Sequence, residues 1–315
     1  MKTAFVFPGQ GSQQVGMGRS FYEQYSEARE VFTRADEVLG YSLSALCFEG
    51  PKEELQQTTN TQPAVLTASI ASLAVLSAQG VKADVAAGHS LGEYAALVSA
   101  RAIDFSVAVK IVQRRGQLMQ EAVPLGSGGM LAVLGLAGEA IDKVVQKART
   151  KGVVEAANYN CPGQVVLAGE TLALEAVVAA AKEAGAKKCL ILAVSGPFHS
   201  SLMRTASELF AVELTKKTRI KKPAFPVVAN ATANYVKTVA EVRGALVRQI
   251  YSPVLWEDGI RRLFQDGVRI FVEIGPGKVL SGLIRRIVPE AICCNVEDPA
   301  SLDAAMRVLQ KAGVV

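Results

Sequence analysis

The stretch VAAGHSLGEYAALVSA (85–100) decides the fold and poses the main question about function. A short apolar segment, 84–87, precedes the turn Gly88-His89-Ser90-Leu91-Gly92, and apolar residues then recur at helical spacing over 91–99. This order predicts a strand, a sharp turn and a helix. In such a context a Gly-x-Ser-x-Gly turn exposes the serine hydroxyl as a nucleophile, next to the free N–H groups of the helix N-terminus.

The same residues permit a second interpretation of Ser90. Glu93 follows three residues later, so the serine and glutamate also fit a capping box that only stabilises the helix start. Because short motifs match by chance, the pentapeptide favours the nucleophile without excluding the cap.

The rest of the chain alternates short apolar runs with amphipathic stretches, a pattern typical of an α/β protein with a mainly parallel sheet. The 315 residues, half of them hydrophobic, suffice for a sizeable core. We expect strands at 3–7, 84–87, 130–136, 153–158, 164–169, 188–194, 225–230 and 269–274. We expect helices at 19–39, 61–79, 91–99, 104–121, 138–150, 171–184, 200–217, 238–251, 256–266, 278–287 and 300–312.

The order of elements changes between 130 and 194. It becomes strand, helix, strand, strand, helix, strand, with the turn YNCPG (159–163) between the middle strands. This is the order of a ferredoxin-like unit. We therefore predict a small domain at 126–195 inserted into a catalytic domain formed by 1–125 and 196–315, with the site in the cleft between them.

Composition argues against several classes of protein. The net charge of +5 is mild and no basic-aromatic pattern accompanies it, so we expect no nucleic-acid partner. The apolar stretch 64–76 is shorter than the roughly 20 residues of a membrane span, so a buried helix is expected. The N-terminal MKTAFVFPGQG leaves no room for a signal peptide, which predicts a cytoplasmic protein. The five cysteines lack metal-ligand spacing and are interpreted as reduced packing residues, with no metal site.

A serine nucleophile needs a base, and the chain contains two histidines. His89 adjoins Ser90, where side chains diverge, so we interpret it as an orienting or packing residue. His199, in GPFHSSLM (196–203), is the better candidate. No motif marks a carboxylate that would hold its ring: Asp104, Glu155, Glu273 or a backbone carbonyl all remain open.

Acyl transfer also requires donors for the oxyanion. One should be the N–H of the residue after the nucleophile, Leu91. The loop FPGQGSQ (7–13) directly follows the first expected strand, and we predict that it supplies the Gln10 N–H. A dinucleotide-binding role for Gly9-x-Gly11 is disfavoured because Gln14 occupies the third glycine position.

Six segments occur in the order found in the malonyl-CoA:acyl-carrier-protein transacylases of fatty-acid synthesis, and the chain resembles that family over its whole length. They are FPGQGSQ (7–13), GHSLGEYAAL (88–97), QRRGQLMQEAVP (113–124), NYNCPGQVVLAG (158–169), GPFHSSLM (196–203) and VEIGPGKVL (272–280). The resemblance implies an α/β-hydrolase-like large domain with an inserted ferredoxin-like domain. It also implies ping-pong transfer of malonyl from malonyl-CoA, through a malonyl-serine, to the phosphopantetheine thiol of acyl carrier protein.

The resemblance also implies residue roles. Ser90 matches the nucleophile and His199 the base, and the main-chain carbonyl of Gln249 matches the group that holds the histidine. Gln10 and Leu91 match the oxyanion donors. Arg115 matches the arginine that binds the malonyl carboxylate through two parallel hydrogen bonds, Phe198 resembles the phenylalanine of malonyl-selective enzymes, and Asn160 is a candidate substrate contact.

No tightly bound cofactor is expected, only the CoA thioester and the carrier protein as substrates. Carrier proteins are acidic, so basic segments could dock them: KKTRIKK (216–222), Arg261-Arg262 and Arg285-Arg286. We expect a monomer.

Three alternatives stay open at this point. A serine esterase or thioesterase would use the same turn without needing Arg115. A carrier-binding scaffold would keep the fold without forming an adduct at Ser90. A related acyltransferase could prefer another acyl group.

Overall fold

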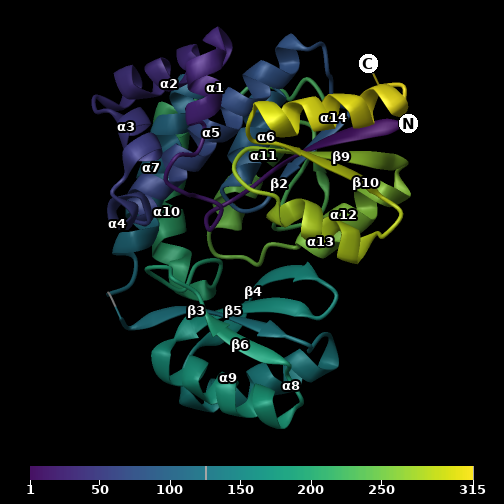
Figure 1. Ribbon diagram of the computed structural model, residues 1–315. Helices are drawn as coiled ribbons and strands as arrows, with labels where there is room; N and C mark the ends of the chain where they lie inside the picture. The colour runs from purple at the N-terminus through teal and green to yellow at the C-terminus, as the bar shows by residue number, and fades with distance from the viewer. Residues whose placement is uncertain (125, 315) are drawn as a thin grey trace.

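The computed structural model describes residues 1–124 and 126–314, which form two β-sheets and their covering helices (Figure 1). The larger sheet has six strands in the order β10-β9-β1-β2-β7-β8. All neighbours are parallel except β7 and β8. Its strands are β1 (Lys2–Phe7), β2 (Val85–Gly88), β7 (Val227–Val228), β8 (Tyr235–Val236), β9 (Val268–Ile274) and β10 (Ile292–Val296).

The second sheet is antiparallel and has four strands in the order β4-β5-β3-β6. They are β3 (Gly128–Leu134), β4 (Val154–Cys161), β5 (Gln164–Glu170) and β6 (Lys188–Ile191). Helices α8 (Glu139–Ala148) and α9 (Thr171–Glu183) cover one face, at the bottom of Figure 1. The opposite face joins the main core through Met130, Ala132 and Val166. The predicted α/β fold with a separate ferredoxin-like sheet is confirmed, while the domain boundaries at 126 and 195 stay a prediction.

The other helices surround the six-stranded sheet or lie beside it (Figure 1). They are α1 (Arg19–Gln24), α2 (Ser26–Leu39), α3 (Leu43–Glu49), α4 (Lys52–Leu55), α5 (Thr58–Ala78), α6 (Gly92–Ser99), α7 (Phe105–Glu121), α10 (Arg204–Lys217), α11 (Val239–Gln249), α12 (Trp256–Gln265), α13 (Val279–Ile287) and α14 (Pro299–Lys311). Two short 3-10 turns, Arg149–Lys151 and Ser201–Met203, complete the elements.

Several boundaries differ from the sequence prediction. The expected helix at 19–39 is broken at Tyr25, whose backbone is extended. The short helices α3 and α4 and the strands β8 and β10 were not predicted, because their apolar patterns are too brief to show a period. The expected strand at 188–194 ends at Ile191, and its last apolar residues, Leu192 and Val194, line a cavity instead.

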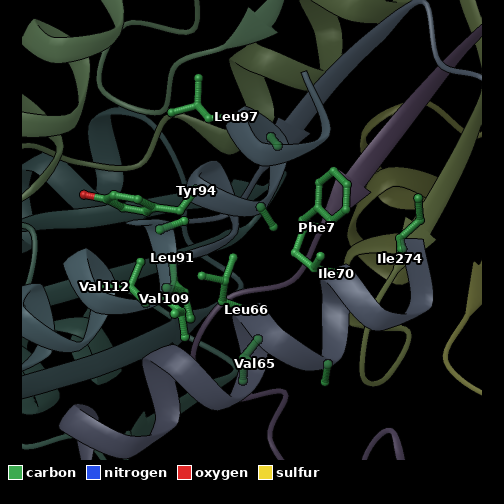
Figure 2. Packing of buried hydrophobic residues seen from close by; sticks show 14 of the residues in the cluster. Phe7, Val65, Leu66, Ile70, Leu91, Tyr94, Leu97, Val109, Val112 and Ile274 are labelled. Atoms are coloured by element: carbon green, nitrogen blue, oxygen red, sulfur yellow. The ribbon is translucent and has the colours of Figure 1, made fainter. Parts of the chain in front are cut away.

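Helix α5 is the centre of the core. It is long and apolar enough to cross a membrane, but 83% of its most apolar window is buried in the protein. Figure 2 shows Val65, Leu66 and Ile70 of this helix packed among side chains of α6, α7, β1 and β9. The apolar stretch at 64–76 is therefore a buried helix, as predicted.

The turn between β2 and α6 is packed against the backbone of β1 without room for side chains. A Cβ at Gly92 would lie 2.1 Å from the Phe7 carbonyl oxygen, and one at Gly88 would lie 1.9 Å from the carbonyl of Gly92. Real Cβ atoms do not approach backbone so closely. Both glycines are therefore required for α6 to start directly above the strand.

We predict that Gly92→Ala unfolds the protein or destabilises it by about 3 kcal/mol, because neither backbone segment can move away without breaking the sheet. Gly244→Ala is the matched control: Gly244 lies within α11, is exposed and has no neighbour within 4 Å of an added Cβ. It should gain stability by about 0.5–1 kcal/mol through helix propensity. Urea unfolding of both variants tests this, and equal midpoints would contradict it.

Candidate active site

Ser90 lies on the turn between β2 and α6 in a left-handed conformation, with φ of 51°. Non-glycine residues rarely adopt this conformation, and where they do the surrounding structure holds them. The holding group is Asn230, whose Oδ1 accepts from the Ser90 N–H at 2.6 Å while its Nδ2 donates to the Gly88 carbonyl at 2.7 Å. One side-chain amide thus holds the strained turn at both Gly88 and Ser90.

The Ser90 side chain does not cap the helix. Its Oγ lies 2.7 Å from His199 Nε2, and α6 has no side-chain cap. Glu93 does not reach back to Ser90 either: its Oε2 accepts from the Asn230 N–H at 3.0 Å and from Gln249 Nε2 at 2.6 Å. The capping-box alternative is therefore wrong.

His199 is held by a backbone carbonyl. Its Nδ1 lies 2.8 Å from the Gln249 oxygen. Because a carbonyl only accepts, Nδ1 carries the proton, and Nε2 of the neutral ring is free to accept from the serine hydroxyl. Burial, helped by the positive charge of Arg115, lowers the pKa of His199 to about 3, so the ring is neutral at physiological pH.

The three candidate carboxylates lie elsewhere and none contacts His199. Asp104 caps α7 by accepting from the Ser106 N–H at 2.9 Å. Glu155 accepts from the N–H and hydroxyl of Ser201. Glu273 is fully buried and accepts from the N–H groups of Leu280 and Ser281 at the start of α13. Of the options left open by the sequence, the backbone carbonyl is the one observed.

Gln10 and Leu91 both border the cavity that contains Ser90. Within residues 1–124 and 126–314, neither backbone N–H donates to a protein acceptor. The Gln10 side chain is tied down, since its Nε2 donates to Thr58 Oγ1 at 3.1 Å. Two backbone donors therefore flank the serine with their hydrogen-bonding capacity unused, as an oxyanion hole requires.

Arg115 of α7 is almost completely buried, at 1% exposure, although no carboxylate contacts it in the described part of the chain. Its Nη1 donates to Gln62 Oε1 at 2.8 Å, and its Nη2 donates to Gln249 Oε1 at 2.8 Å and to Ser90 Oγ at 3.3 Å. Its Nε has no partner in the described residues. Arg114, by contrast, is 38% exposed and lies 3.7 Å from Glu213. A buried cation with neutral partners next to the serine is suited to an anionic ligand.

The cavity has a volume of about 220 Å³ and extends from the six-stranded sheet to the small sheet. Its wall includes most of the residues selected from the sequence: Gln10, Ser90, Leu91, Arg115, Asn160, Phe198 and His199. Asn160 Oδ1 lies 2.8 Å from His89 Nε2, and the His89 ring packs against Trp256. His89 thus has an orienting and packing environment, and no hydrogen bond joins it to the Ser90 side chain. Roles in binding for Phe198 and Asn160 stay predictions.

Three residues of the site were missed at the sequence level: Asn230, Gln62 and the side chain of Gln249. Asn230 ends the predicted strand 225–230, and polar residues at the carboxyl ends of parallel strands are frequent site residues, so a signal existed. Gln62 lies inside an apolar helix, where nothing in the local pattern marks it. Within the described chain, no cluster of three or more His, Cys, Asp or Glu side chains could hold a metal ion.

Comparison with known proteins agrees with this geometry. The model of the acyl transferase domain family matches residues 4–301. The malonyl CoA-acyl carrier protein transacylase of Bacillus subtilis is 46% identical over 311 residues, covering 98% of each chain. The chain belongs to the malonyl CoA-acyl carrier protein transacylase family.

Solved structures support the same assignment. The crystal structure of the family member from Clostridium perfringens has a TM-score of 0.96 and 41% identity, and the match covers 100% of this chain and 99% of that one. A type II PKS acyl-carrier protein has been solved in complex with its malonyl-transacylase. That match has a TM-score of 0.95 and 45% identity, and covers 98% of this chain and 100% of that one.

We predict that Ser90 reacts with a neutral sulfonylating reagent such as phenylmethylsulfonyl fluoride almost equally fast at about pH 7.5 and about pH 5.5. A histidine of ordinary pKa would be protonated at the lower pH and lose about tenfold in rate, whereas His199 should remain neutral. The inactivation rate as a function of pH measures this. A tenfold drop centred near pH 6.5 would contradict the burial effect.

Proposed function

We propose that the chain transfers the malonyl group of malonyl-CoA to the phosphopantetheine thiol of an acyl carrier protein, through a malonyl ester of Ser90. This supplies extender units for fatty-acid synthesis. The observation that supports it most directly is the buried Arg115 guanidinium 3.3 Å from Ser90 Oγ, beside the Ser90–His199 hydrogen bond. A nucleophile and a cation so close fit an acyl group that carries its own carboxylate.

In the first half-reaction, His199 Nε2 takes the proton of the Ser90 hydroxyl as Oγ attacks the thioester carbonyl. The Gln249 carbonyl stabilises the resulting imidazolium through Nδ1–H. The tetrahedral oxyanion accepts hydrogen bonds from the N–H groups of Gln10 and Leu91. The intermediate collapses, the carbon–sulfur bond breaks, and His199 returns the proton to the CoA sulfur.

The second half-reaction reverses these steps with a new thiol. His199 takes the proton of the phosphopantetheine thiol as the sulfur attacks the malonyl ester, and it returns that proton to Ser90 Oγ when the ester bond breaks. The chain itself is unchanged after one cycle, so no tightly bound cofactor is needed.

The site favours a charged acyl group for an electrostatic reason. A carboxylate can take two parallel hydrogen bonds from a guanidinium, and here it would also neutralise a buried cation. A neutral acyl group neither forms these two hydrogen bonds nor neutralises the buried cation. Phe198, which is buried in the cavity wall, would limit the room for a substituent on the malonyl carbon.

The cavity mouth is the expected docking region for the carrier protein. Helix α13 contributes Val279 and Leu283 to the cavity, and its Arg286 donates to Gln164 and to the Pro162 carbonyl of the small sheet. Arg286 therefore brings positive charge beside the cavity, whereas Arg285 donates to the Cys293 carbonyl of β10. In the predicted segment 216–222, the exposed Lys216, Arg219, Lys221 and Lys222 form no ion pair within the described residues, which leaves them free to attract an acidic partner.

Arg261 and Arg262 already pair with Glu257 and Asp266, which makes them weaker candidates for docking an acidic carrier protein.

The two sheets are proposed to be the cores of two domains, 126–195 and the remainder, with the reaction between them. The cytoplasm is the proposed location, and a monomer is the proposed state.

The covalent intermediate provides the first test. Intact-protein mass after brief mixing with malonyl-CoA should show a malonyl adduct that is lost on adding phosphopantetheinylated carrier protein. Ser90→Ala should give no adduct. Accumulation of free malonate without an adduct would indicate a hydrolase, and no adduct together with no turnover would support the scaffold alternative.

Acyl selection provides the second test. Arg115→Ala should lower kcat/KM for malonyl-CoA by about 100-fold, the equivalent of two charge-assisted hydrogen bonds, and should not lower the value for acetyl-CoA. Arg114→Ala, at the partly exposed neighbour, is the matched control and should change neither value by more than about twofold. An equal loss for both acyl groups in Arg115→Ala would show that the arginine has a structural role only.

A further inference from the structure

A chain of three buried polar side chains lies behind the reacting serine. Arg115 Nη2 donates to Gln249 Oε1 at 2.8 Å, and Gln249 Nε2 donates to Glu93 Oε2 at 2.6 Å. All three residues are at most 1% exposed. An amide group therefore separates a buried cation from a buried carboxylate.

The charges at its two ends determine which way the amide of Gln249 faces. Its Nε2 also donates to the Ser90 carbonyl at 3.0 Å, so the nitrogen end has two acceptors and the oxygen end has a cation. A flipped amide would place NH2 against the guanidinium and oxygen against both acceptors. Hydrogen bonds to charged groups are the strong ones in a buried site. Much of the free energy that disfavours the flipped Gln249 amide therefore comes from Glu93.

Glu93 is itself fixed in place. Its Oε2 also accepts from the backbone N–H of Asn230, the residue that holds the Ser90 turn. The amide spacer has a further consequence: the carboxylate compensates the charge of Arg115 from a distance, without occupying its donors. A direct Glu–Arg pair would compete with a substrate carboxylate for the same guanidinium.

We propose that Glu93 is a positioning residue for acyl-group selection: its carboxylate orients the Gln249 amide, and the amide oxygen holds Arg115 beside Ser90. The inference rests on the proposed function, because only an acyl group with its own carboxylate uses Arg115. Glu93 does not touch the substrate and acts through Gln249.

The test compares kcat/KM for malonyl and acetyl transfer in the full chain carrying Glu93→Gln. This variant keeps the shape but removes the charge, and it can present NH2 to the Gln249 amide. Burial raises the pKa of Glu93 to about 7, against the hydrogen bonds from Asn230 and Gln249, so the assay is run at about pH 8, where the native carboxylate is charged. The malonyl-to-acetyl ratio should fall by about tenfold or more, with acetyl transfer within about threefold of the native value.

Glu241→Gln is the matched control. Glu241 lies in the first turn of the helix that Gln249 ends, and its carboxylate also accepts backbone N–H groups, at Lys237 and Thr238. The control variant should keep the native ratio even if α11 loses some stability. A ratio that fell equally in both variants would assign the effect to the helix and overturn the role of Glu93.

Gln249→Ala completes a double-mutant cycle, because it removes the amide and keeps the backbone carbonyl that holds His199. It should lower the ratio by itself, and adding Glu93→Gln should cause no further loss, because the two residues act in one chain. Should Glu93→Gln fail to fold, the single variant Gln249→Ala decides: an unchanged ratio overturns the proposal. The proposal is also overturned if the two substitutions lower the malonyl-to-acetyl ratio independently, so that their effects multiply. Equal losses of kcat/KM for malonyl and acetyl transfer overturn it as well. Native protein that transfers no malonyl group would refute the proposed function instead.

Discussion

The close approach of α6 to β1 is the constraint on which the site depends. With no side chain at Gly92, the helix starts directly against the carbonyl groups of Phe7 and Pro8. This contact forces a tight turn, and the turn forces Ser90 into the left-handed region, where its hydroxyl projects from the corner. The same contact brings the loop after β1 to the helix N-terminus, so the N–H groups of Gln10 and Leu91 border one cavity. A steric requirement of the backbone thus positions both the proposed nucleophile, Ser90, and its proposed oxyanion donors.

Gln249 contacts both the proposed base, His199, and the proposed specificity residue, Arg115. Its main-chain carbonyl holds His199, and its side-chain amide holds Arg115. This arrangement suggests why no carboxylate serves as the third member of the triad. A carboxylate beside His199 would also lie near Arg115, would compete with a malonyl group for it, and would raise the pKa of the histidine. A neutral carbonyl orients the ring without these effects.

The sequence was informative where local chemistry determined the structure. The strand, turn and helix around Ser90 follow from a short pattern, and His199 follows because the other histidine is badly placed. The strand order of the small sheet follows from the alternation of elements around the 159–163 turn. By contrast, Asn230, Gln62 and Glu93 gain their roles from contacts between distant segments, with separations of up to 156 residues. The sequence spacing of Glu93 also fits a capping residue, so that alternative stayed open until the structure showed partners that lie far along the chain. Gln249 was indicated only by family resemblance and only for its backbone.

We propose that one preformed cavity holds the carbonyl oxygen and the carboxylate of the same acyl group at the same time. A crystal structure of the malonyl-enzyme, from crystals soaked briefly with malonyl-CoA, tests it most directly. We expect malonyl bonded to Ser90 Oγ, with its ester carbonyl oxygen about 3 Å from the nitrogens of Gln10 and Leu91 and its carboxylate paired with Arg115. An ester oxygen turned away from both N–H groups, or a carboxylate directed to solvent or to another residue, would contradict it.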